Sequence, residues 1–119
     1  MADKPVFDLE ERTFLFAKRC REFMKEVPFS ISNKADLHQL AKASGSVGAN
    51  YIEANESFSR KDYNFRVKIC RKEANESRYW LRLIDLTIKP ELEDERNALI
   101  QEATELMRIF GSLVTKTGE

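Results

Sequence analysis

Basic side chains are concentrated in one stretch of this 119-residue chain. Residues 60–82 contain eight Lys and Arg against three Asp and Glu, whereas the whole chain balances 20 basic against 20 acidic residues. Such an array suits the phosphates of a nucleic acid, because each phosphate that is neutralised releases a condensed counterion. The residues expected to contact nucleic acid are Arg60, Lys61, Lys68, Arg71, Lys72, Arg78 and Arg82.

The same basic stretch has a second interpretation. Residues 83–119 carry four basic and eight acidic side chains, so the basic residues could instead pair with these acidic neighbours. The chain would then be a protein-interaction scaffold that does not bind nucleic acid. The balanced total charge excludes only an indiscriminate binder of polyanions.

Four polar residues fall near the apolar positions of two helix-length segments. They are Asn50, Glu53, Glu73 and Ser77. A buried hydrogen-bond network among them would fix the register of the two helices. A solvated boundary between helices is the competing interpretation, and a functional site is the third.

Residues for catalysis or metal binding are scarce. A di-iron bundle needs paired Glu-x-x-His motifs, but the one histidine, His38, is preceded at that spacing by Ala35. The two cysteines, Cys20 and Cys70, fall on apolar stripes and are expected to be core thiols. We therefore expect a protein that is not an enzyme and that uses no metal or cofactor.

The elements that carry these residues are predicted to be helices. Three prolines and four glycines divide the chain into four long segments, and apolar residues in each recur at spacings of three and four. We predict an all-α, antiparallel up-down-up-down four-helix bundle that forms one domain over residues 1–119. The helices are expected at about 8–26, 33–58, 60–87 and 91–115, with N-caps at Asp8, at Ser32 or Asn33, and at Ser59.

Small residues crowd the middle of the second segment. Gly45 and Gly48 each lower helix propensity by about 1 kcal/mol relative to alanine. Close approach of a neighbouring helix would offset this cost, and a kink or a ligand cradle is the alternative.

Each helix-length segment has one stripe of apolar residues at spacings of three and four, which we call its seam. Apolar residues outside these seams predict self-association. On the third segment the expected oligomer interface consists of Phe65, Ile69, Trp80 and Leu83. The alternative is the wide apolar stripe of a monomeric bundle.

The sequence contains no apolar stretch near the roughly 20 residues that span a bilayer. Its first residues, Met-Ala-Asp-Lys-Pro, lack the apolar core of a signal peptide. We expect a cytoplasmic protein that does not contact a membrane.

Three runs resemble the 23S rRNA intervening-sequence protein family, whose members are also called four-helix bundle proteins. The runs are Ser46-Val47-Gly48-Ala49-Asn50-Tyr51-Ile52-Glu53-Ala54, then Ser59-Arg60-Lys61-Asp62-Tyr63, then Lys72-Glu73-Ala74-Asn75-Glu76-Ser77-Arg78-Tyr79-Trp80-Leu81. The chain departs from many relatives at Glu53-Ala54, where they have Glu-Gly.

The resemblance implies a bundle that assembles as a ring-like homopentamer, with no established enzymatic activity. Some relatives are encoded inside intervening sequences of bacterial large-subunit rRNA genes. A related protein, the accessory variability protein of diversity-generating retroelements, shares the bundle and the ring, with nucleic acid and a reverse transcriptase as its expected partners. The partners expected for this chain are further copies of itself, RNA or DNA, and a protein. The motif positions Asn50, Glu53, Glu73 and Tyr79 are expected to be structural.

Overall fold

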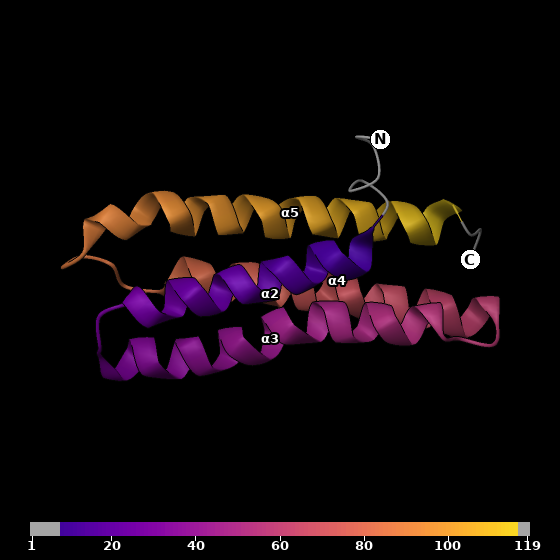
Figure 1. Ribbon diagram of the computed structural model, residues 1–119, viewed down its shortest axis with the longest axis horizontal. Helices are drawn as coiled ribbons and strands as arrows, with labels where there is room; N and C mark the ends of the chain where they lie inside the picture. Colours follow the sequence, from indigo (N-terminus) through magenta and orange to yellow (C-terminus); the bar gives the residue numbers. More distant parts are fainter. Residues whose placement is uncertain (1–7, 117–119) are drawn as a thin grey trace.

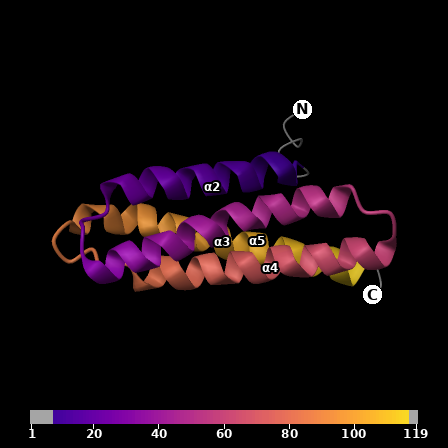
Figure 2. The ribbon, with the colours of Figure 1, turned by 90° about the horizontal axis from the view of Figure 1, so that it is seen from below.

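The computed structural model describes residues 8–116, and within them four long α-helices lie side by side (Figure 1). The turn between the first two helices and the connection between the last two lie at one end of the molecule, and the middle turn lies at the other (Figure 2). The predicted all-α four-helix bundle is therefore confirmed. The elements are α2 (Leu9–Glu26), α3 (Ile31–Asn55), α4 (Arg60–Leu83), the 3₁₀ turn η1 (Pro90–Leu92) and α5 (Glu93–Lys116).

Three of the helices begin at side chains that accept a hydrogen bond from the first turn. The predicted N-caps Asp8 and Ser59 are confirmed, whereas the expectation of Ser32 or Asn33 is wrong because Ser30 has this role. The helix therefore begins at residue 31, earlier than predicted. The amide-to-oxygen distances are 3.1 Å for Glu11 to Asp8, 3.0 Å for Asn33 to Ser30 and 3.0 Å for Asp62 to Ser59.

Asn33 is buried and joins two connections at the same end of the bundle. Its Nδ2 donates to the carbonyl oxygens of Pro28 at 3.0 Å and Asp85 at 2.9 Å, and its Oδ1 accepts the amide of Asp85 at 2.9 Å. Ile84 has already left the helical conformation, with a ψ of 131°. The helix predicted to reach residue 87 therefore ends at Leu83, because the chain turns to meet Asn33.

The core follows the predicted spacing of apolar residues. α4 packs against both α3 and α5, while α2 packs chiefly against α3. Phe58 is an exception: the second helix was expected to include it, but that helix ends at Asn55 and leaves Phe58 fully exposed. Among the described residues, no helix has an apolar stretch that could cross a membrane. The fully buried larger side chains are Phe16, Cys20, Leu40, Val47, Val67, Cys70, Leu81, Leu86, Leu99, Leu106 and Phe110.

The small residues of α3 allow α2 to approach closely. A Cβ added to Gly48 would lie 2.8 Å from Oγ1 of Thr13, closer than such contacts occur. Thr13 is fully buried, and its hydroxyl donates to the carbonyl of Leu9 at 2.7 Å. The neighbour of Gly45 is the flexible end of Arg21, whose Nη2 would lie 3.2 Å away. These distances favour the close-approach interpretation of the glycines.

We predict that Gly48→Ala lowers the free energy of unfolding by about 1–2 kcal/mol in urea denaturation. Overpacking against Thr13 costs more than the helix propensity that alanine gains. Gly45→Ala is the matched control and should be neutral or stabilising, because Arg21 can move aside. The double variant Gly48→Ala with Thr13→Ala should lose less than the sum of the two single changes. An unchanged stability for Gly48→Ala would contradict the close packing.

Candidate nucleic-acid interface

The solvent side of α4 carries a row of basic residues that we call the α4 basic face. At roughly 100° per residue, the three lysines of this row lie on the side of α4 away from the buried residues Val67, Ala74 and Leu81, and its arginine lies on the adjoining flank. All of them are exposed, so the helix presents its positive charge to solvent along most of its length. The α4 basic face consists of Lys61, Lys68, Lys72 and Arg82.

The other three predicted basic residues differ in their surroundings. Arg78 is half-buried, and its guanidinium donates to Oγ1 of Thr104 at 3.3 Å and to Oδ1 of Asn75 at 3.1 Å. Arg71 is exposed and runs beside α5, where a Cβ added to Gly111 would lie 3.8 Å from Nε of Arg71. Arg60 is exposed in the first turn. Arg78 is therefore held between α4 and α5.

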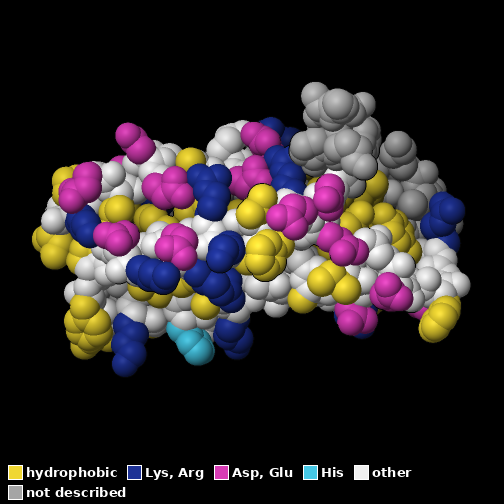
Figure 3. All heavy atoms as spheres, in the orientation of Figure 1, with side chains coloured by type: hydrophobic (Ala, Val, Ile, Leu, Met, Phe, Trp, Pro, Cys, Tyr) yellow, Lys and Arg dark blue, Asp and Glu magenta, His cyan; other side chains and the backbone are white. Residues whose placement is uncertain are grey.

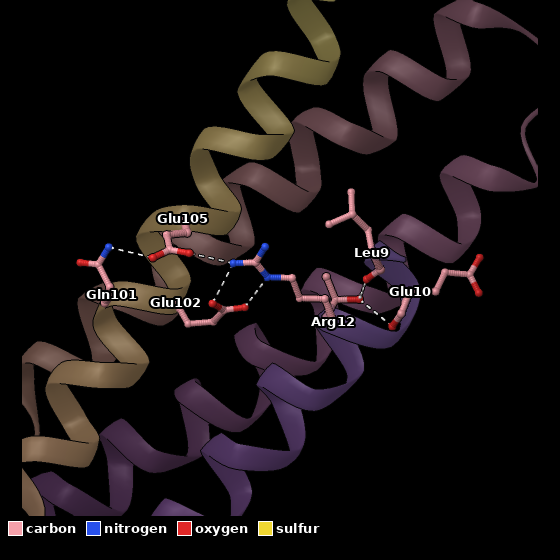
Figure 4. A network of polar contacts seen from close by, with 7 residues as sticks. Leu9, Glu10, Arg12, Gln101, Glu102 and Glu105 are labelled. Carbon is pink, nitrogen blue, oxygen red and sulfur yellow. Dashed lines mark hydrogen bonds and ion pairs between the residues drawn. The ribbon is translucent and has the colours of Figure 1, made fainter. Parts of the chain in front are cut away.

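Three acidic residues of α5, Glu95, Glu102 and Glu105, form ion pairs with α2. Nε of Arg12 lies 2.7 Å from Glu102, and its Nη2 lies 3.0 Å from Glu102 and 2.9 Å from Glu105 (Figure 4). A second pair joins Arg19 to Glu95 at 3.0 Å. These pairs fill the boundary between α2 and α5, where basic and acidic side chains intermingle on the surface (Figure 3).

The electrostatics of this boundary follow its hydrogen bonds. The hydrogen bond to Glu102 is the main cause that raises the pKa of Arg12. The pKa of Glu105 is lowered first by the hydrogen bond from Gln101 and then by that from Arg12. The charged forms on both sides of the boundary are therefore favoured.

Residues of the α4 basic face lack such partners. Across residues 8–116, no carboxylate forms an ion pair with Lys61, Lys68, Lys72, Arg71 or Arg82. The scaffold interpretation expects this stretch to pair with the acidic C-terminal segment, and no such ion pair forms among residues 8–116.

A small hollow lies on α4 among residues of the basic face. Its volume is about 280 Å³, and it is lined by Lys61, Asn64, Phe65 and Lys68. The ring of Phe65 is 60% exposed, while Asn64 is buried beside it. Sequence reasoning missed this hollow, although the spacing of its residues, one helical turn apart, was visible.

The four polar residues expected to form a network do not come together. Oδ1 of Asn50 accepts a hydrogen bond from Arg66 at 3.0 Å, and its Nδ2 donates to the carbonyl of Ser46 at 2.9 Å. The hydroxyl of Ser77 donates to the backbone carbonyl of Glu73 at 2.9 Å. Glu53 is exposed. The contact between Asn50 and Arg66 had no signal in the sequence, because it depends on the register of two helices.

Glu73 is half-buried at the edge of the contact between α3 and α4. Burial raises the pKa of its carboxyl, and the nearby charge of Glu76 raises it further, while Lys72 and Lys42 oppose the shift. Lys42 precedes Asn50 by eight residues, which is about 12 Å along a helix. Glu73 and Asn50 therefore sit on different parts of the contact.

The four residues expected at an oligomer interface differ in exposure. Phe65 and Leu83 are 60% and 47% exposed, whereas Ile69 and Trp80 are half-buried. Trp80 packs against the core and meets the ring of Tyr79 edge-on at 5.0 Å between centroids. The exposed Lys72 and Glu76 lie between Phe65 and Leu83 on the same face, so the apolar residues form two separate patches.

The cysteines lie in the core as expected from the sequence. Burial raises the pKa of both thiols, Cys20 and Cys70, to about 12, so neither is a thiolate at neutral pH. Over residues 8–116, no group of three or more His, Cys, Asp or Glu side chains is arranged to hold a metal ion. His38 is exposed near the start of α3.

We predict that Glu73→Gln raises Tm by about 1–3 °C at pH 7, because burial disfavours the charged carboxylate in the folded state. The sign follows from a folded-state pKa above the unfolded one. The gain should therefore shrink as the pH falls toward the ordinary value of about 4.3, where both states bind the proton. Thermal unfolding monitored by circular dichroism measures this, with the exposed Glu56→Gln as control. A lower Tm for Glu73→Gln would instead indicate a hydrogen-bond network.

Comparison with known proteins agrees with this fold. Residues 7–112 match the family described as 23S rRNA-intervening sequence protein. A solved structure of a protein with unknown function from the S23 ribosomal protein family of Bacteroides thetaiotaomicron VPI-5482 superposes with a TM-score of 0.73 and 27% sequence identity. The match covers 88% of this chain and 96% of that one. No curated protein matches. Since the family match spans most of the helical bundle, the chain belongs to the 23S rRNA-intervening sequence protein family.

Proposed function

We propose that this protein is a non-enzymatic homo-oligomer that binds structured RNA or DNA through the basic residues of α4. The proposal rests on one observation: the α4 basic face forms no ion pair within residues 8–116. An exposed row of unpaired cations favours binding to a phosphate backbone, because neutralising the phosphates releases their condensed counterions.

The dimensions of the α4 basic face suit a helical nucleic acid. From Lys61 to Arg82 the helix rises about 31 Å, close to the roughly 34 Å of one duplex turn. Lysine contacts to phosphate position a protein on a duplex but do not read its sequence. We therefore propose recognition of shape and charge with little base specificity along this face.

Self-association is the second part of the proposal. Among residues 8–116, ten large apolar side chains are at least 47% exposed. Two of them, Phe14 and Ile52, border a groove of about 470 Å³ between α2 and α3. A second copy that covers such residues would remove them from water, and a ring would repeat the α4 basic face so that weak contacts gain avidity.

A protein-interaction scaffold is the alternative function, and the apolar end of the bundle favours it. Phe29, Ile31 and Ile88 are 79–85% exposed. They belong to the α2–α3 turn, the start of α3 and the α4–α5 connection, which lie at one end of the molecule (Figure 1). A partner protein could cover this end without using the basic residues of α4.

We predict that the protein binds RNA or DNA with an affinity that falls steeply with salt, and that Lys68→Ala with Arg71→Ala weakens this binding. Each lost phosphate contact should reduce the slope of log K against log salt by about 0.7–0.9. Fluorescence anisotropy at several salt concentrations measures both quantities. The control is Lys25→Ala with Lys34→Ala, which removes the same charge from exposed positions on α2 and α3. Absence of binding to any RNA or DNA at about 50 mM salt would contradict the proposed nucleic-acid binding.

We predict that the protein sediments at equilibrium as an oligomer at micromolar concentration. A mass of about five times the 13.9 kDa of the chain is expected from the family resemblance. Substitution of Phe14 and Ile52 by serine should reduce that mass if the α2–α3 groove is the contact. A single species of 13.9 kDa would contradict self-association.

A further inference from the structure

The hollow on α4 combines an exposed aromatic ring with two lysines. We propose that Phe65 stacks on an unpaired base of the bound nucleic acid while Lys61 and Lys68 contact the phosphates on either side of that base. This inference rests on the proposed function and narrows its ligand to nucleic acid that contains unpaired nucleotides, such as a loop, a bulge or an end.

The positions on the helix bring the three side chains together. Lys61 precedes Phe65 by four residues and Lys68 follows it by three, which are the spacings at which helix side chains are neighbours about 5–6 Å apart at Cβ. The aromatic ring is 60% exposed, so its face is open to a ligand. Across the described residues, neither lysine has a carboxylate partner that a phosphate would need to displace.

The size of the hollow restricts what can enter it. Pockets for drug-sized ligands have volumes of about 300–1,000 Å³, and this one is about 280 Å³. It therefore suits a single ring system rather than a larger ligand. The base faces of a duplex are covered by neighbouring base pairs, whereas an unpaired base offers its face to an aromatic side chain.

A contact between two copies of the chain explains these residues less well. Phe65 has a lysine on either side along the helix, and both charges would lose water if a protein surface covered the ring. The sequence predicted that Phe65 and Leu83 belong to one oligomer interface. On the helix surface, however, the exposed residues Lys72 and Glu76 lie between them. A nucleic acid, by contrast, can stack a base on the ring and place phosphates beside both lysines at the same time.

Phe14 provides an internal comparison. It is 57% exposed and also borders a hollow, but the lining of that hollow includes the carboxylate of Glu10 together with Lys18 and Arg21. A phosphate placed there would meet a negative charge, whereas the hollow beside Phe65 has no acidic residue in its lining. The matched control for loss of an exposed phenylalanine is Phe58→Ala, because Phe58 is fully exposed and lines neither hollow.

The experiment compares three oligonucleotides of equal length by fluorescence anisotropy: a single strand, a fully paired duplex and an abasic strand. Phe65→Ala should weaken binding of the single strand by about 5- to 150-fold and leave the duplex and the abasic strand within about two-fold. Phe65→Trp should restore the single-strand affinity, whereas Phe65→Leu should not, because leucine has no aromatic face. The effect should be the same for RNA and DNA, since every base can stack.

A spectroscopic readout tests stacking directly. A single strand that carries 2-aminopurine should lose fluorescence when the wild-type protein or Phe58→Ala binds it, and should keep its fluorescence when saturated with Phe65→Ala. Equal weakening of all three oligonucleotides by Phe65→Ala would overturn stacking but leave binding through the α4 basic face intact. A change in sedimentation mass with Phe65→Ala would overturn it too, because Phe65 would then be an interface residue. Failure of the wild-type protein to bind any oligonucleotide would overturn the proposed function itself.

Discussion

Arg12 joins α2 to α5 through two ion pairs. Its guanidinium bridges Glu102 and Glu105 across the boundary between α2 and α5, where the helices share less contact than the other neighbouring pairs. A planar fork of donors suits two carboxylates better than an ammonium would. Arg12 and Arg19 together pair with three acidic residues of α5, and no ion pair within residues 8–116 joins the α4 basic face to α5. The total charge of zero therefore arises because the surplus of five positive charges in residues 60–82 is offset by an excess of four negative charges in residues 83–119 and one in residues 1–59.

The seam positions of this fold could be predicted from the sequence, because burial and spacing are local properties of each helix. Phe16, Val67 and Leu106 are buried where the alternation of three and four residues requires. The ends of the helices were less predictable. The residue type of Asn33 predicted an N-cap. Its side chain instead forms hydrogen bonds with Asp85, which is 52 residues away in the connection between α4 and α5. Such a contact depends on how the second half of the chain returns, and residue type alone does not encode it.

The candidate site was predictable in part for the same reason. A run of lysines and arginines on one helix is visible as charge, and its solvent side follows from the position of the seam. The partners of those residues are not visible, because they depend on rotation and register between helices. Arg78 meets Thr104, and the neighbouring Arg66 meets Asn50, although neither pairing has a sequence pattern. The separation of the expected apolar face into two patches likewise could not be predicted, because it became visible only from the exposure of each side chain in the structure.

Asn33 has a further consequence for the motions of the bundle. The hairpin formed by α3 and α4 is closed covalently at one end by residues 56–59 and at the other end by the hydrogen bonds between Asn33 and Asp85. A helical hairpin held only by its turn can fray from its open end, but here fraying must first break the hydrogen bonds of the buried Asn33 side chain. The amide hydrogen of Asp85 should therefore exchange with solvent at the rate at which the whole hairpin opens. α4 then behaves as a rigid rod whose outer face keeps a constant spacing between its charges.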